Sequence, residues 1–276
     1  MIIQTDLDKN GIIRQVDLQY QNFSTDLRFG VPRTWDLNKV LSGDIFPCLE
    51  PNSVEFRTVW ENYARGMPHN SIAYIRKPIP TNSLKSLCST TKAGAVVRLG
   101  ICFSKVQQHM ERTPAKFALM IIRVQNRQLW LQYVAQRRKV RRDCQAILGG
   151  DGGEIEKTLY HGCFEDVASK ICSSRFNRSF AGVQNGTAYG IGTYFTNSSH
   201  MASRYGKVSK RAGDRVCVIQ AKVLTGLMIG GLNQPTVRVL KSLNKHSTIN
   251  NPARPSVFVA FHDAAAYPEY VIDYIK

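Results

Sequence analysis

One stretch, residues 159–205, constrains the fold and function of this chain more than any other. It contains the pair His161-Gly162 at the end of a short apolar segment, where a glycine lets a ligand approach the backbone closely. A loop rich in Asn, Gly, Ser and Gln follows, and a Gly-x-Gly turn then leads into Tyr194-Phe195. Polar donors and stackable rings therefore converge on a surface shaped by glycine, which is typical of a site for a planar heteroaromatic ligand.

The strands and helices expected elsewhere favour an α+β fold. Short strands are expected at 215–224, 257–261 and 270–274, and the few helices do not alternate regularly with them. The Gly-x-Gly at 190–192 ends a loop instead of opening a helix, so it is not a dinucleotide-binding fingerprint.

Charge and cysteine content narrow the class of protein. The net charge of +17 over 276 residues exceeds what one pyrophosphate ligand requires. Two interpretations of the charge therefore stay open: it serves solubility, or it binds a nucleic acid or another polyanion. Seven cysteines without a C-x-x-C pair predict reduced thiols and no zinc site. With no secretory leader and no long apolar run, we expect a soluble protein of the nucleus, the cytoplasm or both, without a membrane span.

Several ordered motifs resemble the catalytic domain of the poly(ADP-ribose) polymerase family of diphtheria-toxin-like ADP-ribosyltransferases, especially its macrodomain-containing, mono-ADP-ribosylating branch. The motifs are HG at 161–162, FNRS at 176–179, AYG-x-GTYF at 188–195, KVLTG at 222–226, RPSVFVAF at 254–261, YPEYVI at 267–272, and RVQN with LW at 123–130. The resemblance covers about residues 117–276. It implies two small antiparallel sheets that form a split β core with a few flanking helices.

The resemblance also implies the chemistry of the site. NAD+ would be the co-substrate, without a metal, and nicotinamide would leave through an oxocarbenium-like transition state. The backbone of Gly162 would hold the carboxamide, Tyr194 and Tyr205 would lie against the ring, and His161 would donate a hydrogen bond to the adenosine-side ribose. The residues expected at the co-substrate are His161, Gly162, Asn177, Arg178, Ser179, Tyr189, Tyr194, Ala202, Ser203 and Tyr205.

Position 257 is expected to decide the type of transfer. Polymerising members of the family carry a glutamate in a catalytic set whose members here are His161, Tyr194 and Val257. A valine cannot accept a hydrogen bond, so we expect no chain elongation. Ala202 stands where the family has a carboxamide-binding serine, with Ser203 one residue later, and Glu269 is expected to be structural.

Three functions follow as expectations. The first is mono-ADP-ribosylation of protein side chains, with Glu or Asp as the expected acceptors and self-modification as a further option. The second is an inactive scaffold of the same fold that binds NAD or ADP-ribose. The third is a basic nucleic-acid-binding protein, which rests on the net charge and on the basic run at 137–142.

The resemblance divides the chain into three parts. Residues 1–30 form an arm that weakly resembles the last hairpin of a WWE domain. Residues 31–116 lead into the domain, with a helix expected over 53–65 and a flexible insertion at 78–100. Residues 117–276 form the catalytic domain.

The expected 53–65 helix is capped by Ser53 and has its apolar side at Val54, Phe56, Val59, Trp60 and Tyr63. A partial repeat matches 54–76 with 101–123, so that Val54 corresponds to Ile101, and we expect the second copy to occupy the native position.

Overall fold

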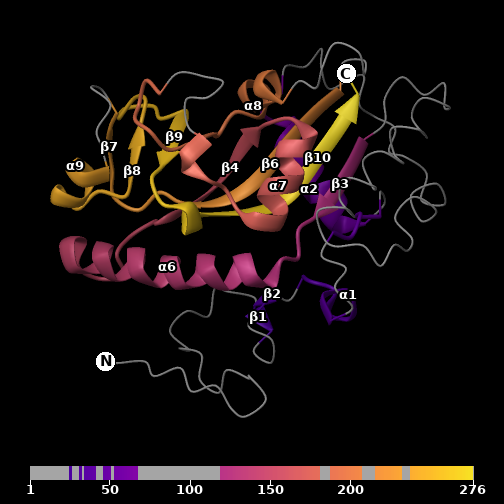
Figure 1. Ribbon diagram of the computed structural model, residues 1–276, viewed down its shortest axis with the longest axis horizontal. Helices are drawn as coiled ribbons and strands as arrows, with labels where there is room; N and C mark the ends of the chain where they lie inside the picture. The colour runs from indigo at the N-terminus through magenta and orange to yellow at the C-terminus, as the bar shows by residue number, and fades with distance from the viewer. Residues whose placement is uncertain are drawn as a thin grey trace.

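The computed structural model describes residues 25–26, 31–32, 34–41, 46–50, 53–67, 119–180, 187–206, 215–231 and 237–275 (Figure 1). The hairpin expected within residues 1–24, the insertion at 78–100 and the helix of the second repeat copy lie outside these residues.

Eight strands form one sheet in the order β3-β10-β6-β4-β5-β9-β8-β7. Their bounds are Leu119–Arg123 (β3), Glu156–Gly162 (β4), Thr193–Thr196 (β5), Arg215–Leu224 (β6), Met228–Gly230 (β7), Ser247–Ile249 (β8), Val257–Ala260 (β9) and Ala266–Ile275 (β10). Two short strands, Thr25–Asp26 (β1) and Val31–Pro32 (β2), pair separately.

The sheet is nearly divided between β4 and β5, which are joined by the single pair of Tyr160 with Thr196. Four strands lie on each side of this junction, and β7 and β8 are the parallel pair. The α+β class is confirmed. The resemblance implied two sheets, whereas the structure has one split sheet, because the pair of Tyr160 with Thr196 connects the two halves. The half that contains β7 and β8 is mixed and not purely antiparallel.

Helices cover both faces of the sheet. Their bounds are Leu37–Leu41 (α1), Val54–Ala64 (α2), Arg127–Leu148 (α6), Glu165–Ser174 (α7), Ser199–Tyr205 (α8) and Val237–Ser242 (α9), with 3-10 turns at Arg178–Phe180 (η2) and Asp263–Ala265 (η3). Among the described residues, no helix combines the length and the apolar character that crossing a membrane demands.

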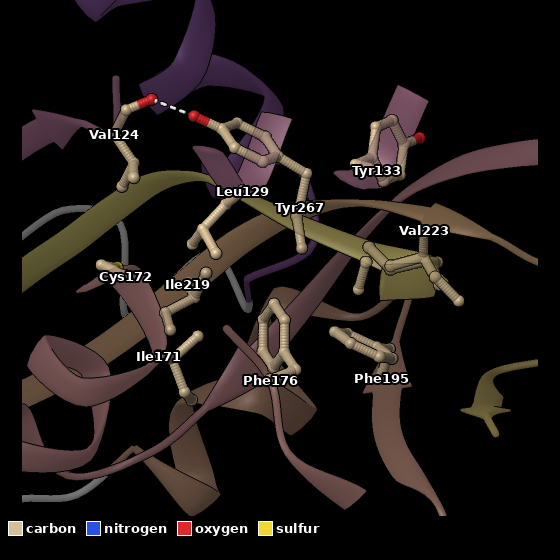
Figure 2. Close-up of a cluster of buried hydrophobic side chains, with 14 of the residues drawn as sticks. Val124, Leu129, Tyr133, Ile171, Cys172, Phe176, Phe195, Ile219, Val223 and Tyr267 are labelled. Atoms are coloured by element: carbon tan, nitrogen blue, oxygen red, sulfur yellow. Dashed lines mark hydrogen bonds between the residues drawn. The ribbon is translucent and has the colours of Figure 1, made fainter. Parts of the chain in front are cut away.

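Helix α6 builds the larger core (Figures 1 and 2). Its first turn is capped by Asn126, whose side chain accepts from the Leu129 N–H at 3.2 Å. Its apolar side packs on the sheet, where the Trp130 and Tyr267 rings meet edge to face at 5.2 Å. The Tyr267 hydroxyl donates to the Val124 carbonyl at 2.6 Å (Figure 2), so this buried polar group is satisfied.

Helix α2 covers the sheet over β3 and β10. Ser53 caps it as predicted, accepting from the Phe56 N–H at 3.1 Å, and Phe56 and Tyr63 are among its buried residues. Val54 is 72% exposed, so its expected place on the apolar side was wrong. The position lies about 140° around the helix from Val59, which turns it to solvent.

The strand of the second repeat copy is β3, whereas the helix that packs against it, α2, comes from the first copy. Glu55 of α2 accepts from Arg123 Nε and from the Tyr270 hydroxyl, each at 2.7 Å, and the Tyr63 and Tyr274 hydroxyls lie 3.1 Å apart. The second copy has Cys102 and Met110 at the two matching positions, and Gly100 in place of the cap. Only the first copy can make these hydrogen bonds.

We predict that Glu55→Ala lowers the free energy of unfolding by about 2 kcal/mol, because it leaves the half-buried Arg123 guanidinium and the Tyr270 hydroxyl without their acceptor. Urea denaturation measures the loss. Glu61→Ala, on the exposed side of the same helix, is the matched control and should change stability by less than about 0.5 kcal/mol. Equal effects of the two substitutions would contradict the assignment of α2 to this position.

Candidate active site

The candidate site lies where β4 and β5 separate. The Cys163 N–H donates to the Cys217 carbonyl of β6 at 3.3 Å, whereas Tyr160 pairs with Thr196 of β5. Residues of an antiparallel strand bond to its two neighbours in alternation. The N–H and C=O of Gly162 therefore point away from β6, toward the β5 side of β4. They lie beyond Tyr160, which makes the last pair with β5. The open edge presents one backbone donor beside one backbone acceptor.

The imidazole of His161 holds this junction open. By the register that joins Tyr160 to Thr196, Tyr194 is the residue that would face Gly162 in the next pair. Its carbonyl lies instead 2.8 Å from His161 Nδ1. The side chain of His161 makes the hydrogen bond that would have continued the sheet. Within the described part of the chain, the backbone of Gly162 on this side is therefore left for another partner.

The environment of His161 keeps its ring neutral. Burial lowers the pKa of His161, and the hydrogen bond to Tyr194 opposes this shift. The ring also packs against Phe176 and Phe195, with centroids 5.5 and 5.7 Å away. A carbonyl only accepts, so Nδ1 carries the proton and Nε2 of the neutral ring is an acceptor. We expected His161 to donate toward ribose, whereas in this tautomer Nε2 is a hydrogen-bond acceptor.

Gly162 is also a point of close contact between α8 and the sheet. A Cβ at this position would lie 1.9 Å from the Ala202 carbonyl oxygen and 2.7 Å from the Gly206 nitrogen. Only glycine therefore allows α8 to sit against β4. Tyr205, at the end of α8, is 53% exposed, so its ring is free to lie against a ligand.

Neither candidate on α8 presents a free hydroxyl at this edge. Ala202 is buried in the cluster that contains Tyr63 and Tyr160. The hydroxyl of Ser203 donates to the His200 carbonyl of the same helix at 2.8 Å. A one-residue shift from Ala202 to Ser203 therefore does not supply the family's serine.

The Tyr194 side chain supports a turn. Its hydroxyl accepts from the Tyr189 N–H at 3.0 Å and donates to the Gly190 carbonyl at 2.9 Å, and the Tyr189 carbonyl accepts from Thr248 Oγ1 at 2.6 Å. Burial raises the pKa of Tyr194, so the hydroxyl stays protonated. His161 and Tyr194 do come together, but through the backbone of Tyr194.

Arg178 of the FNRS motif is held by residues that follow β9. The Arg178 N–H donates to Asp263 Oδ1 at 3.1 Å, and its guanidinium donates to the Phe261 carbonyl. Asn177 accepts from the Ser179 N–H at 2.9 Å, and both of these side chains are exposed. Arg178 thus anchors the motif to residues that follow β9. Its expected place beside the pyrophosphate stays a prediction.

Val257 begins β9 opposite Thr196, and its N–H donates to Asn250 Oδ1 at 3.0 Å. The carboxylate of Glu269 cannot replace a glutamate here, because β10 is separated from β9 by β6, β4 and β5. Glu269 lies 3.4 Å from Lys222 Nζ, in keeping with its expected structural role.

Sequence reasoning missed Asn250 and Asp263, which fix Val257 and Arg178. Both stand in turn-forming contexts, Asn250-Asn251-Pro252 and His262-Asp263, where side chains commonly bond to nearby backbone. Within the described ranges, no group of three or more His, Cys, Asp and Glu side chains is arranged to hold a metal ion.

We predict that the His161 ring takes up a proton with a midpoint below about 6.5, the ordinary value for histidine. The folded state then binds fewer protons than the unfolded state, so charging His161 destabilises the fold as the pH falls below about 6.5. Histidine ring NMR over pH 5–8 measures the midpoint and the tautomer, with the urea-unfolded chain as control. A midpoint above the unfolded value, or a proton on Nε2 at pH 7, would contradict the assignment.

Comparisons with known proteins identify the family of the chain. Residues 102–251, more than half of the chain, match the family model of the poly(ADP-ribose) polymerase catalytic domain. Protein mono-ADP-ribosyltransferase PARP14 of Homo sapiens is 31% identical over 182 residues, which is 63% of this chain and 10% of that protein. PARP10 of Mus musculus is 35% identical over 156 residues, 54% of this chain and 15% of the relative. PARP12 of Mus musculus is 30% identical over 178 residues, which is 62% of this chain and 24% of that relative. The matched regions thus span 10% to 24% of these relatives, and the chain belongs to the poly(ADP-ribose) polymerase catalytic domain family.

Proposed function

We propose that this chain is a mono-ADP-ribosyltransferase that moves ADP-ribose from NAD+ to protein side chains and releases nicotinamide. The observation that carries the proposal is the open edge at Gly162 beside the neutral ring of His161. The relatives named as protein mono-ADP-ribosyltransferases support it.

The residues at the open edge fit the nicotinamide half of NAD+. A carboxamide has one acceptor and one donor group, and the N–H and C=O of Gly162 complement both. The exposed ring of Tyr205 would stack on the pyridine, contributing about 1 kcal/mol. His161 Nε2 would accept from a ribose hydroxyl and fix the orientation of the sugar. When bound, NAD+ supplies a ribose carbon whose bond to nicotinamide breaks through an oxocarbenium-like transition state.

Val257 favours transfer of a single unit. Extending a chain requires a ribose hydroxyl to lose a proton, and β9 offers no carboxylate for this purpose. A Glu or Asp acceptor is already ionised at neutral pH, so its oxygen can attack the ribose carbon without a base. The bond from the carboxylate oxygen to the ribose carbon forms while the bond from that carbon to the pyridinium nitrogen breaks. Nicotinamide takes the bonding electrons and leaves as a neutral molecule, so no proton has to move. This chemistry favours acidic side chains as acceptors, including those of the chain itself.

Ala202 and Ser203 favour a second candidate, a scaffold that binds NAD or ADP-ribose without transfer. The hydroxyl that would complete the carboxamide contacts is absent at Ala202, and that of Ser203 is bonded within α8. Losing one such hydrogen bond costs about 1 kcal/mol, which weakens binding several-fold but does not remove Gly162 or His161.

We predict that the purified chain, incubated with labelled NAD+ and cell extract, attaches single ADP-ribose units to proteins, and that His161→Ala reduces the label about tenfold or more because the ribose loses its acceptor. Mass spectrometry of the modified peptides distinguishes single units from chains. The unfolding midpoint of His161→Ala should confirm that the variant is folded.

Ladders of label from the wild-type chain would refute the argument from Val257. A chain that NAD+ stabilises against unfolding but that attaches no label would be the scaffold. A chain that shows neither effect would contradict both functions.

A further inference from the structure

The basic run on α6 divides into paired and unpaired side chains. Arg137 Nε lies 2.8 Å from Glu156 Oε2, and Lys139 Nζ lies 2.6 Å from Asp143 Oδ2. Arg141 donates to the Asp151 carbonyl at 2.7 Å. These three cations therefore have partners within the fold.

Arg138 and Arg142 differ from their neighbours. Both are exposed, and within the described part of the chain neither forms an ion pair. They lie four residues apart, which places them on one face of the helix with about 5–6 Å between their Cβ atoms. Like charges at this spacing destabilise a helix by about 0.2–0.5 kcal/mol, so the fold gains nothing from the pair.

Among the described residues, the surroundings of the two arginines leave room for a large partner. The exposed Ala135 and Ala146 continue the same face on either side, and small side chains allow close approach. Figure 1 shows α6 along one side of the sheet, with this half of the helix away from β1, β2 and α1. Trp35 contacts Trp130 at 6.1 Å, so the segment leading into α1 covers the other half.

A loop with a further cation approaches α6 at Asp143. His246 Nε2 lies 3.4 Å from Asp143 Oδ2, which brings the loop containing Lys245 next to α6. The Asp143 carboxylate is already shared between Lys139 and His246, so it does not neutralise the arginines. The positive charge of the two arginines adds to that of a chain whose net charge is +17.

We propose that Arg138 and Arg142 form a docking surface for the phosphate backbone of a nucleic acid duplex, without recognition of sequence. The guanidinium fork matches the geometry of phosphate oxygens, and a duplex presents regularly spaced charges to a straight helix. An anionic membrane would require large apolar side chains on the same face. The exposed Ile147 and Leu148 lie about 160° and 100° around the helix from the midpoint between the two arginines, outside the face that the arginines share.

The test is the binding of a fluorescein-labelled 20-base-pair duplex of RNA or DNA to the full chain, measured by anisotropy across a series of salt concentrations. For the double variant Arg138→Gln with Arg142→Gln, we expect the affinity at 0.1 M salt to fall about tenfold or more. The slope of log affinity against log salt should become shallower by about two, because two phosphate contacts are lost.

The matched control is Arg57→Gln with Lys170→Gln, which removes the same charge from exposed positions on α2 and α7 and should leave affinity and slope near the wild-type values. Equal losses in the two double variants would show that only net charge matters and would overturn the proposal. It is equally overturned if the wild-type chain does not bind the duplex at 50 mM salt. Vesicles of anionic lipid and polyglutamate are tested in the same way. If either binds through Arg138 and Arg142 and the duplex does not, the surface belongs to another partner and the proposal is overturned.

Discussion

The contact between Gly162 and α8 is the constraint on which the candidate site depends. The backbone of α8 lies so close to β4 that any side chain at position 162 would collide with the Ala202 carbonyl. Because α8 packs at this position, the end of β4 lies against a helix. Beyond Tyr160, β4 no longer pairs with β5. His161 then captures the carbonyl of Tyr194, and the donor and acceptor of Gly162 remain at the open edge. One missing Cβ thus connects helix packing, the split of the sheet and the chemistry of the site.

A neutral histidine and an apolar Val257 favour the same kind of reaction. Burial keeps the His161 ring uncharged, so it can accept a hydrogen bond but adds no positive charge beside a cationic ribose. Val257 removes the base that a hydroxyl acceptor would require. Both features suit an acceptor that brings its own negative charge. The arginine pair on α6 is unpaired within the described fold, and its proposed role is independent of this reaction.

The sequence predicted local structure where a local motif determines the geometry. The strand that ends at His161 and Gly162 was expected, and so was α2, from its cap and the spacing of Phe56, Val59 and Tyr63. The orientations of Arg178 and Tyr194 were not predicted, because they depend on Phe261, Asp263 and Thr248, which are distant in sequence. The division of the sheet was expected, but its continuity depends on the single pair of Tyr160 with Thr196, which no local pattern indicates.

The most direct test of this account is the response of the Gly162 amide to benzamide, which carries the carboxamide of nicotinamide without the rest of NAD+. Amide NMR of the labelled chain should show a large shift and slowed hydrogen exchange at Gly162 when benzamide is added. Benzoate, which lacks the amide donor for the Gly162 carbonyl, should bind much more weakly. An unchanged Gly162 resonance at saturating benzamide, or equal responses to the two compounds, would contradict the claim that this backbone edge is the nicotinamide site.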